Sequence, residues 1–195
     1  MSQLPDPENA ASPTPERKSR KTWITYLVLV WCLLGSLSLF ALIFHYQFIP
    51  APDWVDRISY VAWSAGLITA LGFTFLLWSG RSKIPGGRIK FAFVLLCAPL
   101  FGLFLGWNAV TFGIPMVFAA VAGHETEIQF SVVRADEFGG KRCRHPVKLE
   151  IATLFDEVCD IPDSFRETLS PGDKIVLIGR GTTMGLFPAG AGKLD

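Results

Sequence analysis

The chain has 195 residues, of which 50% are hydrophobic and 18% are charged, and its formal net charge at pH 7 is +1. Its mean hydropathy is +0.38. This composition excludes a large water-soluble protein, because the polar part of the chain suffices for one modest aqueous domain at most.

Three long stretches, residues 23–44, 58–78 and 91–122, contain no Asp, Glu, Lys, Arg or His. About 20 apolar residues at ~1.5 Å rise per residue match the ~30 Å hydrocarbon core of a bilayer, and a helix satisfies its own backbone at that depth. The sequence therefore predicts a membrane protein with three transmembrane α-helices within residues 23–122. A cleaved signal peptide is the competing interpretation of the first stretch.

The N-terminal arm, residues 1–22, combines four prolines with Ser, Asn and Glu and ends in basic residues. It has almost nothing apolar to bury, so we expect it to be disordered. Basic residues flank the apolar stretches in two clusters, Arg17, Lys18, Arg20 and Lys21 and then Arg81, Lys83, Arg88 and Lys90. By the positive-inside rule both clusters lie in the cytoplasm. This predicts a multi-pass protein of a bacterial inner membrane, with a cytoplasmic N-terminus and an extracytoplasmic C-terminal domain.

The third apolar stretch is longer than a bilayer requires, since 32 residues of helix would extend roughly 48 Å. Trp107 and Asn108 form a natural interfacial stop, and Gly113 and Pro115 interrupt the residues that follow. We therefore expect a span that ends near residue 108, followed by a kinked extension through residue 122. A tight helical hairpin is the alternative.

Small residues recur four positions apart on two of the predicted spans. Such strips let transmembrane helices approach closely, because no side chain separates the two backbones. We expect them to pack the second span on the third, with self-association or a partner contact as the alternative. The helix-packing candidates are Ala62, Gly66 and Ala70 on the second span and Ala98, Gly102 and Gly106 on the third.

The spans carry no ionisable residue between the membrane interfaces, so they offer no ion or proton pathway of the usual kind. They also offer no His at mid-membrane depth that would hold a haem. The tail contains no nucleophile motif and no phosphate-binding glycine motif. We therefore expect no catalytic residue, no cofactor and no metal.

The tail predicts a small, mostly-β domain over residues 123–188 and a flexible segment over residues 189–195. Polar and apolar residues alternate along residues 125–132, and shorter strands are expected at residues 143–151, 158–161, 174–179 and 186–188. Ser164 and Glu167 have the spacing of a helix capping box. The predicted fold class is α+β: three spans, then a meander or a partly open barrel of the SH3-like or OB-like kind.

Two cysteines of the tail, Cys143 and Cys159, form a disulfide candidate. An oxidising compartment favours disulfides, and a domain of about 70 residues has a small core that a cross-link would stabilise. Free thiols are one alternative. The other is a metal or thiol site in which His145 joins the two cysteines, with His124 or Asp160 as a further ligand.

The function predicted from these features is that of a non-enzymatic membrane protein whose extracytoplasmic β domain serves protein interaction or complex assembly. The alternatives are an accessory subunit of a transport or respiratory complex, and a thiol or metal enzyme centred on Cys143 and Cys159. The expected partners are the lipid bilayer and another membrane or envelope protein, or a second copy of the chain. Nucleic acid is not expected.

Overall fold

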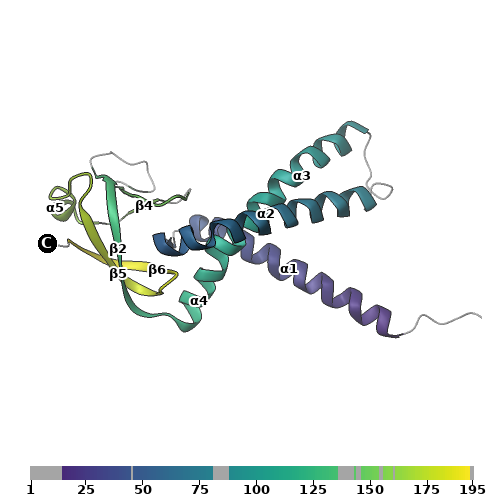
Figure 1. Ribbon diagram of the computed structural model, residues 1–195, viewed down its shortest axis with the longest axis horizontal. Coiled ribbons are helices and arrows are strands. Elements are labelled where there is room, and N and C mark those ends of the chain that lie inside the picture. The colour runs from purple at the N-terminus through teal and green to yellow at the C-terminus, as the bar shows by residue number, and fades with distance from the viewer. Residues whose placement is uncertain are drawn as a thin grey trace, which may run out of the picture.

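Three long helices precede a curled antiparallel sheet (Figure 1). The computed structural model describes residues 15–44, 46–80, 88–135, 143, 146–153, 156–159 and 161–193. The predicted α+β class, with apolar helices first and a mostly-β domain after them, is confirmed.

The long helices are α1 (Pro15–Ile43), α2 (Pro52–Gly80) and α3 (Arg88–Asn108). Each contains or begins a helical segment long and apolar enough to cross a membrane. In Figure 1, α2 and α3 run alongside each other, while α1 diverges from them toward its N-terminus. The chain is therefore organised around an α2–α3 hairpin that α1 crosses.

α1 begins at Pro15, so the prediction of a disordered arm was wrong for residues 15–22. Proline is accepted in the first turn of a helix, because the first N–H groups have no partner within the helix. Glu16, Arg17 and Lys18, which follow, are good helix formers. The rest of the arm, residues 1–14, lies outside the described residues.

The third apolar stretch is one continuous helical run. α3 passes into a π-helical turn, η2 (Ala109–Gly113), and then into α4 (Ile114–Ala122). The predicted interfacial stop at residue 108 was wrong, because Asn108 is buried inside the bundle and the helix continues through it. Pro115 lies in the first turn of α4, where its missing N–H is tolerated. Residues 88–122 pass through α3, η2 and α4 without the sharp turn that a helical hairpin needs.

Six strands form one sheet in the order β1-β6-β5-β2-β3-β4, and all neighbouring pairs are antiparallel. The alternation predicted over residues 125–132 is confirmed in β2, where Phe130 and Val132 are buried. The strands are β1 (Ile49–Pro50), β2 (His124–Arg134), β3 (Val147–Leu149), β4 (Glu157–Val158), β5 (Lys174–Thr182) and β6 (Gly185–Lys193).

β6 extends well beyond the strand predicted over residues 186–188. It pairs with β5 as far as Lys193, so the prediction of a flexible segment from residue 189 was wrong up to residue 193. Residues 189–193 have little strand propensity of their own, being mostly glycine and alanine. Their order comes from the backbone hydrogen bonds that β5 offers.

The segment between β4 and β5 contains the short helix α5 (Asp163–Arg166) and a tight turn. The predicted capping box was wrong, because the N-cap residue is Pro162 and no side chain caps the helix. In the turn, Gly172 has a φ of +92°, which glycine adopts readily. Asp173 accepts hydrogen bonds there from Lys193 and from the N–H of Ser170, and these hold the pKa of its carboxyl below the usual value.

The core of the β domain includes residues from the connection between α1 and α2. Ile175, Leu177 and Leu186 are fully buried, and Ile49 and Val55 belong to the same apolar cluster. The predicted domain start at residue 123 therefore leaves out part of the folded unit. The helices and the β domain are therefore joined twice, by the chain that leads from α4 into β2 and by the packing of the α1–α2 connection in the domain core.

Candidate functional site

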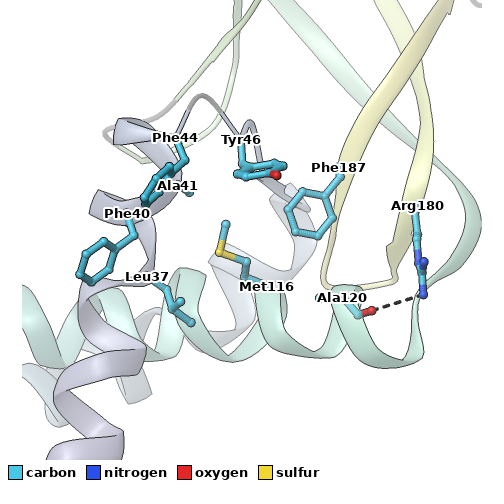
Figure 2. A pocket seen from close by; sticks show the side chains of 9 residues that line it. All are labelled: Leu37, Phe40, Ala41, Phe44, Tyr46, Met116, Ala120, Arg180 and Phe187. Atoms are coloured by element: carbon cyan, nitrogen blue, oxygen red, sulfur yellow. Dashed lines mark hydrogen bonds between the residues drawn. The ribbon is translucent and has the colours of Figure 1, made fainter.

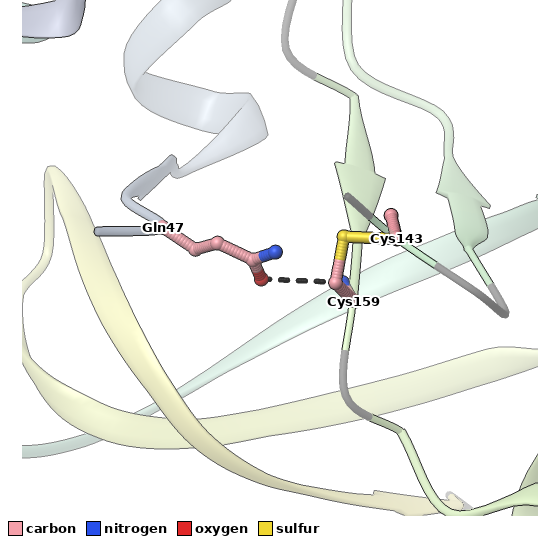
Figure 3. The surroundings of a disulfide bond; sticks show 3 residues. All are labelled: Gln47, Cys143 and Cys159. Atoms are coloured by element: carbon pink, nitrogen blue, oxygen red, sulfur yellow. Dashed lines mark hydrogen bonds between the residues drawn. A yellow bond between two sulfur atoms is a disulfide. The ribbon is translucent and has the colours of Figure 1, made fainter. Parts of the chain in front are cut away.

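The predicted disulfide pair lies beside the α1–α2 connection (Figure 3). The Cα atoms of Cys143 and Cys159 are 5.3 Å apart, and their sulfur atoms are at bonding distance. The side chain of Gln47 accepts a hydrogen bond of 3.1 Å from the N–H of Cys159. This bond joins the residue after β4 to the segment before β1. Because β1 and β4 are the two outer strands, the bond brings the two edges of the curled sheet toward each other.

The alternative metal site lies partly outside the described part of the chain. His145 and Asp160 lie outside the described residues, and His124 is an exposed residue at the start of β2. Among the described residues, no group of three His, Cys, Asp or Glu side chains has an arrangement that would hold a metal ion.

Four of the six small residues of the predicted strips, Gly66, Ala70, Gly102 and Gly106, lie at the contact between α2 and α3. Ala62, Ala70 and Ala98 are buried. A Cβ atom built on Gly102 would lie 2.7 Å from the Cα of Ala70, and one on Gly66 would lie 2.9 Å from the carbonyl oxygen of Leu103. A Cβ on Gly106 would likewise lie 2.7 Å from the Cα of Gly66. The two strips therefore face each other within one molecule.

Two further glycines, which sequence reasoning missed, form the contact with α1. A Cβ on Gly35 of α1 would collide with the carbonyl of Leu105, and a Cβ on Gly113 of η2 would collide with the carbonyl of Leu34. Gly35 has no small residue four positions away, and Gly113 has one, Ala109, which gives a pair but no longer strip. The signal in the sequence is the presence of an isolated glycine within an apolar helix, where it permits close approach of another helix.

A buried polar bridge lies beside this contact. Ser38 of α1 donates a hydrogen bond of 2.9 Å to Oδ1 of Asn108, whose amide donates to the carbonyl of Phe104 at 2.9 Å. Ser38 and Asn108 are 6% and 1% exposed. Thr111 of η2 is equally buried, and its hydroxyl has no hydrogen-bond partner within the described part of the chain. The bridge fixes the register of α1 on α3.

The junction between helices and sheet is held by three kinds of contact. β1 pairs with β6 through Ile49 and Leu186. The N–H of Ala51 donates to the carbonyl of Met184 at 3.0 Å. The rings of Phe48 and Phe187 meet edge to face with centroids 5.2 Å apart. Because of these contacts, the α1–α2 connection and the β domain must lie on the same side of any bilayer that the helices cross.

A hollow of about 1020 Å³ lies between the start of α2 and the edge of β2. We call it the edge groove. Strand β3 pairs with β2 only at Val132 and Arg134, so the preceding part of β2 has no neighbour on that side among the described strands. Residues 126–131 of β2 line the groove.

The backbone of β2 points hydrogen-bonding groups into this groove. The carbonyl of Ser131 accepts from Glu150 on the β3 side, whereas Val132 pairs with the turn before β5. Backbone groups of a strand alternate between its two neighbours. The N–H and C=O of Gln129 and Glu127 therefore point to the same side as those of Ser131, into the edge groove.

The charge of the edge groove is mainly negative. Lys148 and Asp156 form an ion pair of 3.3 Å. Lys174 is the other basic residue of the lining. The acidic residues of the lining are Asp53, Asp56, Glu127, Glu150 and Asp156. The groove therefore suits a segment that carries positive charge.

Comparison of the chain with models of protein families, with curated proteins and with solved structures finds no match in any of the three. The function must therefore be argued from the geometry of the molecule itself.

Proposed function

We propose that this chain is a non-enzymatic integral membrane protein of a bacterial inner membrane, with a cytoplasmic N-terminus and an extracytoplasmic β domain. In this proposal the domain, a partly open barrel of the SH3-like or OB-like kind, binds an extended segment of an envelope protein along the edge groove. The observation that carries the proposal is that β2 at Glu127 and Gln129 has no paired strand on the groove side within the described part of the chain, because such an edge accepts an added strand.

The mode of binding would be strand addition. A partner strand beside β2 would receive main-chain hydrogen bonds from Glu127 and Gln129. Lysine or arginine side chains of the partner would meet the carboxylates of Asp53 and Asp56, which lie across the groove near the start of α2. Charge would thus select a basic segment, while the backbone supplies affinity.

The junction supports this role, because it holds the groove in place. The groove has one wall from α2 and one from the sheet, and the β1–β6 pairing keeps the two walls together. A preorganised site loses less entropy on binding than a mobile one. The β domain would therefore present its partner at a fixed position above the membrane.

A photocrosslinking experiment tests the proposal. A photoreactive amino acid placed at Gln129 in the full chain should capture a defined envelope protein in intact cells. The same amino acid at Glu167, an exposed residue after α5, should capture nothing at comparable yield. Capture of no protein at Gln129, or of the same proteins at both positions, would contradict strand addition.

A pair of variants tests the main-chain contribution. Gln129→Pro removes one N–H that points into the groove and leaves the N–H groups that face β5 intact, whereas Gln129→Ala keeps that N–H. We expect proline, and not alanine, to abolish partner capture from a probe at Glu127. Unchanged thermal melting of the proline variant serves as the folding control, and equal capture by both variants would argue against the proposal.

A second candidate function is an accessory subunit of a transport or respiratory complex. It is favoured by residues 22–30 of α1, because the side chains of all nine are exposed in the single chain. A photoreactive residue at Leu29 should then crosslink to another transmembrane chain or to a second copy. The matched position Leu100, exposed on α3, should not. Lipid adducts alone at both positions would remove this candidate.

A further inference from the structure

A second groove, lined mainly by apolar side chains, lies between the ends of α1 and α4 that are next to the β domain (Figure 2). We call it the interfacial groove. Its volume is about 540 Å³, within the range of roughly 300–1,000 Å³ that small-molecule sites show. Leu37 and Phe40 of α1, Met116 of α4 and Phe187 of β6 line it, and Phe44 follows them just after α1.

The position of this groove matches the boundary between hydrocarbon and headgroups. The apolar segment of α1 ends at Ala41, and that of the third helical run ends at Ala122. Both ends lie at the groove, which is also lined by Ala41 and Ala120. Phe40 and Phe44 are 47% and 66% exposed, so their rings face the medium that surrounds the helices. At this depth that material is lipid.

One cation, Arg180 of β5, lies at an end of the interfacial groove. Its Nη2 donates a hydrogen bond of 3.3 Å to the carbonyl of Ala120, one of the last four carbonyls of α4, which have no partner within the helix. An arginine has five N–H donors, and the side chain of Arg180 is exposed, so donors remain for an anion. Within the described part of the chain no ion pair to Arg180 occurs, although Glu125 lies opposite it on β2.

We propose that the interfacial groove binds one anionic phospholipid of the leaflet next to the β domain. The acyl chain lies along the apolar floor past Met116 and Leu37, and the phosphate binds Arg180. A molecule with a long apolar chain and an anionic end complements a groove with apolar walls and a single cation at one end. Because the edge groove is a separate site, this lipid site does not rest on the proposed function.

The test uses the full chain in vesicles of phosphatidylcholine that contain phosphatidylglycerol with a photoactivatable group in its acyl chain. Labelling should fall on the peptides that contain Leu37, Phe44 and Met116. Since charge-assisted hydrogen bonds to phosphate are strong, Arg180→Ala should reduce phosphatidylglycerol labelling roughly tenfold. Labelling by an equivalent phosphatidylcholine probe should change far less.

Lys174→Ala is the matched control, because Lys174 is an exposed cation at the other end of the same strand. It should leave labelling unchanged, and Glu125→Gln should increase it by removing the competing carboxylate. Equal labelling of the parent chain and the Arg180→Ala variant would overturn the proposal. So would labels spread evenly over all three spans, or displacement of the lipid by glycerol phosphate at equal concentration, which would assign Arg180 to a soluble phosphate.

Discussion

The side-chain oxygen of Gln47 accepts a hydrogen bond of 3.1 Å from the backbone N–H of Cys159. Gln47 precedes β1 and Cys159 follows β4, the two outermost strands of the sheet. One side chain from the membrane connection thus links both edges of the β domain and contacts the disulfide candidate. This bond is one of the contacts that couple the helices to the β domain, and a single substitution at Gln47 removes it.

Gln47→Ala should destabilise the β domain by about 1–3 kcal/mol, because the N–H of Cys159 loses its partner. Denaturant unfolding in detergent would measure the free energy, and hydrogen exchange at residues 156–159 should accelerate. Gln129→Ala is the matched control, since it truncates an exposed glutamine of the same domain. Equal stability of the two variants would show that the Gln47 bond contributes nothing.

Gly102→Leu should destabilise the helix bundle by about 1–3 kcal/mol or more, because the side chain would enter the space that the backbone of α2 occupies. Gly72→Leu is the control, because a Cβ at Gly72 would have no atom within 4 Å. Thermal melting in mild detergent should fall for the first variant and stay near the parent value for the second. Similar melting of both would refute the close approach of α2 and α3.

The hydrogen bond between Ser38 and Asn108 should contribute about 0.6 kcal/mol and no more than about 1.7 kcal/mol, the average and the maximum for hydrogen-bonded pairs between transmembrane helices. A double-mutant cycle with Ser38→Ala and Asn108→Leu isolates this term. Ser36→Ala is the control, because Ser36 is bonded only to the carbonyl of Leu33 in its own helix. Strict additivity of the two changes would mean that the bridge does not couple α1 to α3.

Cys143 and Cys159 should be bonded to each other in the mature protein. Alkylation without reductant should then modify neither, and replacing both by serine should cost the domain about 2–5 kcal/mol while membrane insertion is unaffected. Cys97→Ser, at an exposed free cysteine of α3, should leave stability unchanged. Rapid labelling of either tail cysteine in oxidised protein, or one retained equivalent of zinc, would instead support thiol or metal chemistry.

The orientation in the membrane is testable with impermeant thiol reagents in intact cells. A cysteine at the exposed residue Glu167 should be labelled, and one at Ser82, in the basic stretch of sequence between α2 and α3, should be labelled only after lysis. Ala51, in the connection on the other side, is a poor probe position because it is 3% exposed. The opposite labelling pattern would place the β domain in the cytoplasm and remove the basis for a disulfide.

Sequence patterns predict those helices and strands that depend on the local periodicity and composition of the chain. The charge-free stretches predict the apolar helices, and the alternation around Ile128 predicts β2, because each pattern has one dominant physical cause. The facing glycines of α2 and α3 also follow from spacing along a single helix. Each of these features can be read from a short window of sequence.

Features that depend on distant partners are not predictable in this way. β1 has two residues, one of them proline, and it exists because β6 offers its edge. Asn108 resembles an interfacial residue at the end of an apolar run, but Ser38 on another helix satisfies it. The edge groove is likewise defined by where β3 stops pairing with β2, which no local pattern indicates.

The pairing of Ile49 with Leu186 has a consequence for biogenesis. Strand β1 emerges from the ribosome with the first hairpin of the membrane region, but its partner is synthesised only after all three apolar segments. The pairing of β1 with β6 can therefore form only after all three apolar segments have been synthesised. A tail expressed by itself from residue 123 would lack β1, and the exposed edge of β6 would be open to pairing with other copies.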